Sequence, residues 1–119
     1  MENNSWFKHF PGAITVTDAN GTISAMNDAS AEMFQKDGGY ALLGKSVFAC
    51  HPPASQAKVR TLYENAAANI YTITKNGKKR LIYQAPYFEE DRFAGMIEMC
   101  LDLPDSTPHF DRDNPKKGS

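Results

Sequence analysis

Residues 69–103, NIYTITKNGKKRLIYQAPYFEEDRFAGMIEMCLDL, decide the fold. Runs of β-branched and aromatic residues cover 69–74, 79–88 and 93–103, and turn-forming residues at 75–78 and 89–91 separate them. The Asn-Gly pair in the first of these turns is a strong signal for a tight hairpin. The last run is apolar on both sides of the strand, which is typical of a central strand. The stretch therefore predicts three strands joined by short turns, with the last strand inside the sheet.

The segment before these strands predicts one longer helix, from Pro53 to Ala68. Apolar residues recur there at helical spacing, at Val59, Leu62, Tyr63 and Ala66. Pro52 and Pro53 suit the first helical turn, where backbone N–H groups have no intrahelical partner.

Shorter elements precede this helix. A helix over 29–34 would be capped by Asn27 or Asp28, broken by the pair of glycines in 37–39, and followed by a helical turn over 40–43. The alternating run 13–18, an Asn-Gly turn and the run 22–26 predict a hairpin.

A short amphipathic lead-in helix is predicted over 4–10, where Trp6, Phe7 and Phe10 have helical spacing before Pro11-Gly12 ends it.

The composition indicates one globular domain with an N-terminal cap and a polar tail. The chain has 119 residues and a formal net charge of −1, so it offers no basic field for a phosphate backbone, and we expect no nucleic-acid partner. No apolar run approaches the roughly 18 residues of a membrane span, and the first residues have neither the basic nor the apolar stretch of a signal peptide. We expect a cytoplasmic protein without membrane contact. The predicted units are the cap helix 1–12, the domain 13–103 and a disordered tail 104–119.

Cysteine and histidine spacing does not predict a metal site. The two cysteines, Cys50 and Cys100, form no CxxC motif, and the three histidines are scattered along the chain. A reducing compartment argues against a disulfide between Cys50 and Cys100.

Short motifs, in their order and spacing, resemble those of the PAS domain family of sensory modules. They are Ile14-Thr-Val-Thr-Asp18 with Asn20-Gly21 and Ile23, the helix Asn27-Asp-Ala-Ser-Ala-Glu-Met-Phe34, the step Leu43-Gly44-Lys45, the turn Lys75-Asn-Gly-Lys78, and the last strand Gly95-Met-Ile-Glu-Met-Cys-Leu-Asp102. The resemblance runs from about Pro11 to Leu103. It implies an α+β fold: a five-stranded antiparallel sheet with short helices and one longer helix packed mainly on one face, plus the lead-in helix.

Departures from the family pattern bear on cofactors. Val47 stands where flavin photosensors carry their reactive cysteine, and an ungapped match places Val59 where haem members carry the iron-ligating histidine. Flavin chemistry and the familiar haem ligation are therefore disfavoured, and the cofactor is left unknown. The family's terminal D-I-T is Asp102-Leu103-Pro104 here, and the given sequence ends 15 residues later. If it is the complete gene product, we expect the signal to pass to a protein partner in trans.

The stretch Phe48-Ala-Cys-His-Pro-Pro53 leaves alternatives open. A Cys50–His51 catalytic dyad is disfavoured, because neighbours in sequence usually point apart and no oxyanion hole is evident, so we do not expect an enzyme. His51 at a helix entrance favours a structural role, with contact to an organic ligand and ligation of haem or a metal as alternatives.

By the resemblance, side chains of the first and last strands alternate between a ligand cavity and the outside. Thr15, Thr17, Met96, Glu98 and Cys100 are expected to face the cavity. A carboxylate there is the most informative feature, because an inward Glu98 must either find a donor or remain protonated. We expect the donor to be a tyrosine hydroxyl or a helix N–H within the fold, with the polar group of a ligand as the alternative. Alternation does not decide which of the adjacent pair Tyr83 and Gln84 faces inward. The full predicted cavity set is Thr15, Thr17, Met26, Met33, Phe34, Cys50, His51, Leu62, Met96, Glu98 and Cys100.

The outward apolar side chains are expected to be shielded from water by the lead-in helix of the same chain or of a second copy, and we therefore expect a homodimer. Its predicted interface is Trp6, Phe7, Phe10, Ile14, Val16, Ile97, Met99 and Leu101. The sequence thus favours a sensory, signal-transduction module that binds a small ligand in its cavity, or a protein partner on its sheet, and responds by a conformational shift. The alternatives are a haem- or metal-binding redox or gas sensor that uses His51, and a ligand-free dimerisation module.

Overall fold

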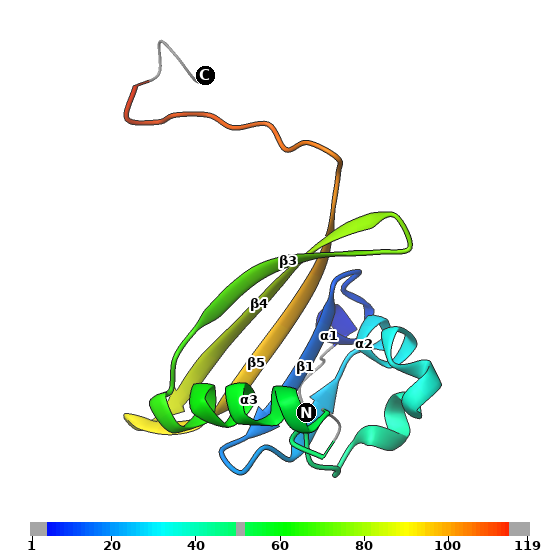
Figure 1. The fold of residues 1–119 in the computed structure, drawn as a ribbon, viewed down its shortest axis with the longest axis vertical. Coiled ribbons are helices and arrows are strands. Elements are labelled where there is room, and N and C mark those ends of the chain that lie inside the picture. The colour runs from blue at the N-terminus through cyan, green and yellow to red at the C-terminus, as the bar shows by residue number, and fades with distance from the viewer. Residues whose placement is uncertain (1–4, 50–51, 115–119) are drawn as a thin grey trace.

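The computed structural model of the protein describes residues 5–49 and 52–114. Its frame is a five-stranded sheet in the order β2-β1-β5-β4-β3, antiparallel at each pairing (Figure 1). The strands are β1 (Ala13–Asp18), β2 (Ile23–Met26), β3 (Asn69–Lys75), β4 (Lys78–Glu89) and β5 (Arg92–Leu103). The predicted α+β architecture is confirmed, and β5 is central, as its two apolar sides indicate.

The helices are α1 (Ser5–His9), α2 (Asp28–Met33) and α3 (Pro53–Asn65), with two 3-10 turns, η1 (Gln35–Asp37) and η2 (Gly39–Leu42), between α2 and α3. The longer helix ends at Asn65 rather than at Ala68, because Ala66 adopts a left-handed backbone with φ of 47°. Its last carbonyls are capped there by backbone N–H groups.

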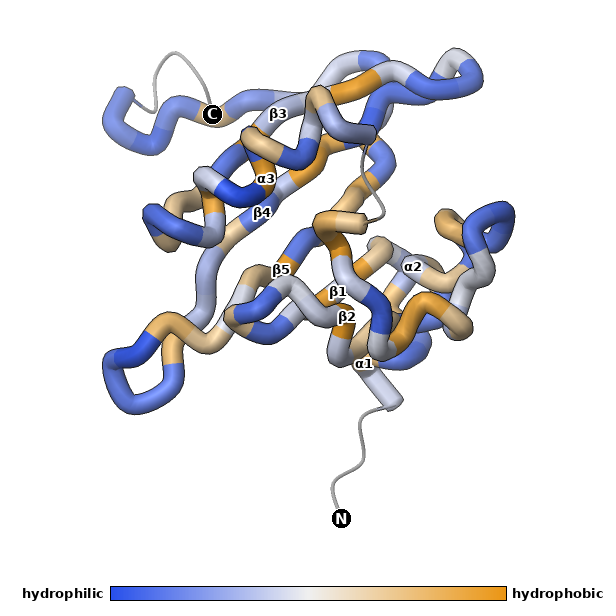
Figure 2. The backbone as a smooth tube through the Cα atoms, turned by 60° about the horizontal axis from the view of Figure 1, so that its bottom comes forward, coloured by the Kyte–Doolittle hydropathy of each residue, from blue (hydrophilic) through white to orange (hydrophobic). Residues whose placement is uncertain are grey.

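Tight turns set the strand pairing. Asn76 (φ 53°) and Gly77 (φ 77°) both have left-handed backbones between β3 and β4, as a two-residue hairpin of the primed type requires. Glu90 (φ 51°) and Asp91 (φ 65°) hold the same conformation between β4 and β5 without the help of a glycine. Hydrophilic residues gather at the tips of these hairpins (Figure 2).

The pairing register decides which side chains share a face. On β1 and β5, Thr15 is opposite Glu98 and Thr17 is opposite Met96, while Gln84 on β4 is also opposite Glu98. Side chains directly opposite one another in an antiparallel pair point to the same side. These residues therefore share one face, which we call the inner face, and the alternate residues Val16, Ile97, Met99 and Tyr83 share the outer face.

Asn27 fixes the entry into α2. Its side chain is fully buried, and its Oδ1 accepts hydrogen bonds from the backbone N–H groups of Ser30 (3.0 Å) and Ile14 (2.9 Å). Its Nδ2 donates to the carbonyl oxygens of Gly12 (2.8 Å) and Phe10 (3.4 Å). Of the two predicted caps, Asn27 is therefore the one that caps α2, and it also joins α2 to β1.

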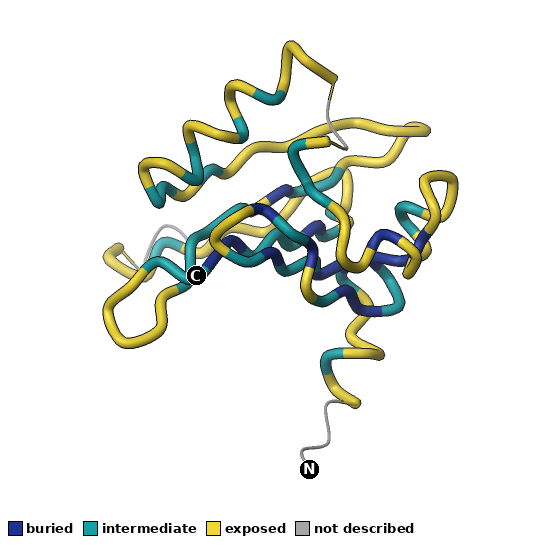
Figure 3. The backbone as a smooth tube through the Cα atoms, turned by 90° about the horizontal axis from the view of Figure 1, so that it is seen from below, coloured by how far each residue is buried: buried dark blue, intermediate teal, exposed yellow. Residues whose placement is uncertain are grey.

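The helices cover the inner face unevenly. One buried cluster joins Ala13, Ile82 and Cys100 under α2, and a second joins Ile23, Met26 and Leu42 under η2. In contrast, no residue of α3 is buried. Figure 3 shows α3 as a largely exposed helix that stands over one side of the sheet, with α1 toward the other side. The sheet, α2 and η2 thus form a packed unit, and α3 lies over it with looser packing.

The two ends of the chain add little to this unit. α1 is tied to α2 by Lys8, whose Nζ lies 2.8 Å from Asp28 Oδ1. Residues 104–114 form no helix or strand and lead away from the end of β5 (Figure 1). Among the described residues, no helix is both long enough and apolar enough to cross a bilayer.

Candidate functional site

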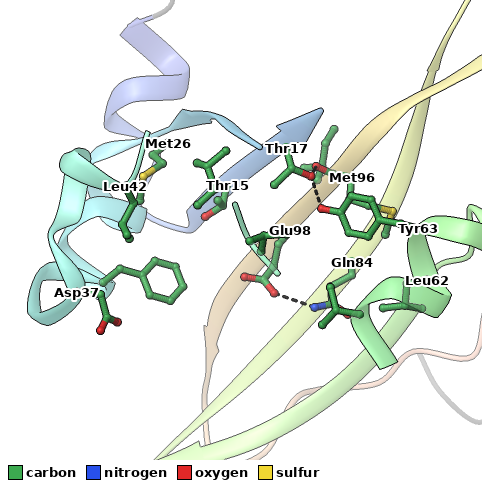
Figure 4. A pocket seen from close by; sticks show the side chains of 15 residues that line it. Thr15, Thr17, Met26, Asp37, Leu42, Leu62, Tyr63, Gln84, Met96 and Glu98 are labelled. Carbon is green, nitrogen blue, oxygen red and sulfur yellow. Dashed lines mark hydrogen bonds between the residues drawn. The ribbon is translucent and has the colours of Figure 1, made fainter. Parts of the chain in front are cut away.

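A cavity of about 250 Å³ lies between the inner face of the sheet and the helical layer (Figure 4). β1, β4 and β5 form its floor, α3 covers one side, and η2 with the end of α2 closes another. The cavity is lined by Thr15, Thr17, Ile23, Met26, Phe34, Asp37, Leu42, Val47, Val59, Leu62, Tyr63, Gln84, Met96, Ile97 and Glu98. Most of these side chains are apolar, and the few polar groups come mainly from the sheet. This is the usual composition of a site for a small organic molecule.

A row of polar side chains crosses the floor of the cavity. Gln84 Nε2 donates to Glu98 Oε2 at 2.9 Å, and Asn69 Nδ2 donates to Gln84 Oε1 at 3.0 Å. Gln84 therefore faces inward, and Tyr83, which is 40% exposed, faces outward. The fold supplies a donor for Glu98, an amide in place of the expected tyrosine hydroxyl or helix N–H.

Hydroxyl pairs join the helices to β1 beside the cavity. The Tyr63 hydroxyl on α3 is hydrogen-bonded to the Thr17 hydroxyl, and Thr15 Oγ1 lies 2.5 Å from Ser30 Oγ on α2. Burial raises the pKa of Tyr63, the bond with Thr17 opposes this, and the charge of Glu98 raises it further. The phenol thus stays neutral at neutral pH and can serve as a hydrogen-bond donor.

Aromatic rings pack around Tyr63 at the same end of the cavity. Its ring makes edge-to-face contacts with Phe48 (5.1 Å between centroids) and Phe93 (6.0 Å). The Arg60 guanidinium lies over the outer side of this group, 4.3 Å from the Phe48 centroid. Tyr63 is therefore the main anchor of α3.

The structure brings together most of the predicted cavity residues. Those on its wall are Thr15, Thr17, Met26, Phe34, Leu62, Met96 and Glu98. Cys50 and His51 lie outside the described residues, so the predicted roles of this pair, including haem or metal ligation by His51, remain predictions.

Met33 and Cys100 do not line the cavity. Cys100 lies two residues beyond Glu98 on the same face of β5, about 7 Å further along the strand, and α2 covers that position. Met33 packs there against the buried cluster of Ala13, Ile82 and Cys100. Cys100 is a free thiol, and burial raises its pKa, so it behaves as a small apolar core residue.

Several residues of the cavity wall were not predicted from the sequence. Val59 and Tyr63 belong to the apolar stripe of the longer helix, so their helical spacing was the signal that could have found them. Gln84 depended on an undecided strand register. Ile23 and Leu42 lie in short elements and Val47 lies in a turn, where periodicity in the sequence does not indicate a face.

The described residues offer no group of three or more His, Cys, Asp or Glu side chains placed to hold a metal ion. Val59, at the position aligned with the haem-ligating histidine of family members, lies on the cavity wall and has no ligating atom.

The residues of the predicted dimer interface differ in how far they are buried. Trp6 is 67% exposed and Phe10 37%, whereas Ile14 is only 6% exposed and contributes mainly to the fold. The others are half-buried: Phe7, Val16, Ile97, Met99 and Leu101. Ile97 was expected to face only outward, but it is also among the residues that line the cavity. Exposed Tyr83 and Ile70, which pair across β4 and β3, extend this apolar surface toward the sheet edge.

Comparisons with known proteins agree with this architecture. A model of the PAS fold family matches residues 7–102. The PAS domain of a Colwellia psychrerythraea protein superposes with a TM-score of 0.62 at 19% identity, covering 85% of this chain and 93% of that one. The PAS domain of Bordetella pertussis BvgS gives 0.62 at 21% identity, covering 83% and 82%.

A third structure is that of the Aer2 receptor from Vibrio cholerae, described as a dual PAS-heme oxygen sensor. It gives a TM-score of 0.59 at 12% identity and covers 78% of this chain and 95% of that one. These likenesses concern the fold. No curated protein sequence matches the chain.

Proposed function

This chain belongs to the PAS fold family, and we propose that it is a sensory signalling module that binds a small organic molecule between α3 and the sheet. The proposed activity is binding rather than catalysis. The signal is a change in the position of α3 over the inner face, and a protein partner recognises this change.

The observation that carries the proposal is the cavity. Its volume of about 250 Å³ exceeds the roughly 150 Å³ in which a dry, apolar protein cavity binds benzene. Its walls combine apolar side chains with a few convergent polar groups, Glu98 and Gln84 among them. A space of this kind can bury the apolar body of a ligand and orient its polar end.

The packing of α3 supports the proposed response. The helix has no buried residue, and its anchor is the Tyr63 contact with Thr17 and the surrounding rings. Val59 and Leu62 face the cavity from the same helix. A ligand that fills the cavity adds contacts to these side chains, so it favours a closed position of α3 over an open one. Differential affinity for the two positions provides the free energy for signalling.

The test is native mass spectrometry of freshly purified protein, with Val59→Trp as the variant and Lys58→Trp as the control. Tryptophan at 59 fills the cavity, whereas exposed Lys58 is beside it on α3 and points away. The proposal predicts an added mass on the wild type and on Lys58→Trp that Val59→Trp lacks. If the wild type is bare and extracts of the source cells add no mass, the ligand-free dimerisation alternative replaces the proposal.

We further propose that the module acts as a homodimer through its outer face. Tyr83 and Ile70 are 40% and 62% exposed there, and Trp6 is exposed on α1, which lies on the side of the sheet away from α3. A second copy of the same surface would remove these apolar groups from water. Tyr83→Glu should yield a monomer in analytical ultracentrifugation, while Lys58→Glu on α3 should leave the dimer intact. A monomeric wild type would contradict the dimer but not the cavity.

A further inference from the structure

The polar groups of the cavity are unevenly divided between donors and acceptors. Among the described wall residues, the charged side chains are Glu98 and Asp37, and there is no Lys, Arg or His. Asp37 is exposed, whereas Glu98 is half-buried on the floor. The charge that a ligand would meet inside the cavity is therefore that of a carboxylate.

Most of the donors on the wall are already engaged. The Thr17 hydroxyl pairs with Tyr63 and lies 3.5 Å from the Met96 carbonyl oxygen. The Thr15 hydroxyl pairs with Ser30. Gln84 uses one N–H on Glu98 and keeps a single N–H for other partners.

Glu98 has acceptor capacity left. A carboxylate offers about four lone-pair positions, and Oε2 accepts one hydrogen bond from Gln84. Oε1 has no protein donor within the described residues. In Figure 4 the carboxylate projects from β5 into the space between η2 and α3. The negative potential reaches the surrounding phenols: burial raises the pKa of Tyr63 and Tyr71, and the charge of Glu98 adds to both.

We propose that the ligand is an organic amine in its ammonium form, with an apolar body against the aliphatic walls and its N–H groups on Glu98. This inference rests on the proposed function, because it names the class of molecule for the same cavity. A charged donor and a partly desolvated carboxylate form a strong hydrogen bond. A carboxylate or phosphate ligand would instead face like charge with no basic side chain on the described wall to compensate.

The cavity volume sets the size of the probes. 2-Phenylethylamine, 2-phenylethanol and phenylacetate share a phenyl body slightly larger than benzene, and their polar ends are cationic, neutral and anionic. Dissociation constants would be measured by isothermal titration calorimetry at neutral pH. We expect the amine to bind at least about tenfold more tightly than the alcohol, and phenylacetate to bind most weakly.

Glu98→Gln tests whether Glu98 causes the preference for the amine, and Glu64→Gln is the matched control. Loss of the charge at 98 should remove the advantage of the amine and leave the affinity for the alcohol within about threefold, which also shows that the variant is folded. Glu64→Gln should keep the advantage, because Glu64 is exposed to solvent on α3 and is not among the residues that line the cavity. Equal affinities for amine and alcohol in the wild type, or a preference for phenylacetate, would overturn the ligand class and leave the cavity proposal standing. Failure of all three probes to bind would overturn both.

Discussion

The hydroxyl of Tyr63 on α3 is hydrogen-bonded to the hydroxyl of Thr17 on β1, so one contact joins the loosely packed helix to the sheet beside the cavity. Thr17 is 4% exposed and belongs to the packed unit of the sheet, α2 and η2. Any movement of α3 away from the sheet must break this contact.

Tyr63→Phe should therefore loosen α3 without unfolding the domain. A hydrogen bond of this kind contributes about 1 kcal/mol to stability, and the ring contacts with Phe48 and Phe93 remain. Hydrogen exchange should become faster in α3 and stay unchanged in β5. Tyr40→Phe is the control, because it removes a hydroxyl bonded to Asp28, away from α3. Equal exchange rates in α3 for wild type and Tyr63→Phe would show that this contact does not hold the helix.

Asn27→Ala should be among the most destabilising single substitutions. It removes a fully buried amide that joins the backbone of Ile14, Ser30, Gly12 and Phe10, and it leaves those groups without partners. We expect a loss of about 2–4 kcal/mol in the free energy of unfolding, measured by urea denaturation. Asn20→Ala, in the exposed first hairpin turn, should change it by less than about 0.5 kcal/mol. A similar small loss for both variants would contradict the assigned role of Asn27.

Much of the fold could be predicted because its signals are local. The Asn-Gly pair at 76–77 sets a hairpin by its own backbone preference, and apolar residues on both sides of Gly95–Leu103 mark a central strand, independent of any distant contact. The placement of Thr15, Thr17 and Glu98 on one face needed the two-residue alternation of a strand, and the resemblance to the PAS family indicated which side faces the cavity.

The extent of the cavity could not be predicted in the same way. Cys100 shares the face of Glu98, and only the position of α2 over the strand separates them. Gln84 and Tyr83 are neighbours, and a shift of one residue in register would exchange their faces. Both questions depend on how distant segments pack, which local patterns do not encode.

The β4–β5 turn should accept a stabilising replacement. Glu90 and Asp91 both have positive φ, a conformation that side chains with a Cβ adopt at a cost, whereas Asn and Gly favour it. Glu90→Asn combined with Asp91→Gly should raise the free energy of unfolding by about 1 kcal/mol in a thermal melt analysed as two-state. An unchanged or lower melting temperature would contradict the assigned turn geometry.

Attachment of α1 to α2 should weaken in acid. Hydrogen bonds from Lys8 and Tyr40 hold the pKa of the Asp28 carboxyl below its ordinary value, so the folded form favours the charged state. This stabilisation is present above the ordinary pKa of an aspartate, about 4, and is lost as the pH falls through the lower folded value. Trp6, the only tryptophan, lies on α1 and reports the change by fluorescence anisotropy. Asp28→Asn should abolish the acid transition, and an unchanged transition in that variant would rule out Asp28 as its source.

The central claim is that a ligand binds between α3 and the sheet. The most direct test is to map the residues that an added ligand perturbs. A ¹⁵N–¹H correlation spectrum would be recorded during titration with 2-phenylethylamine and, separately, with neutral 2-phenylethanol. We predict that the largest shifts cluster at Thr15, Val59, Leu62 and Glu98, which line the cavity on both the sheet and α3. Shifts confined to the outer face, at Val16, Met99 and Tyr83, or no shifts at saturating concentrations of both probes, would contradict a ligand site between α3 and the sheet.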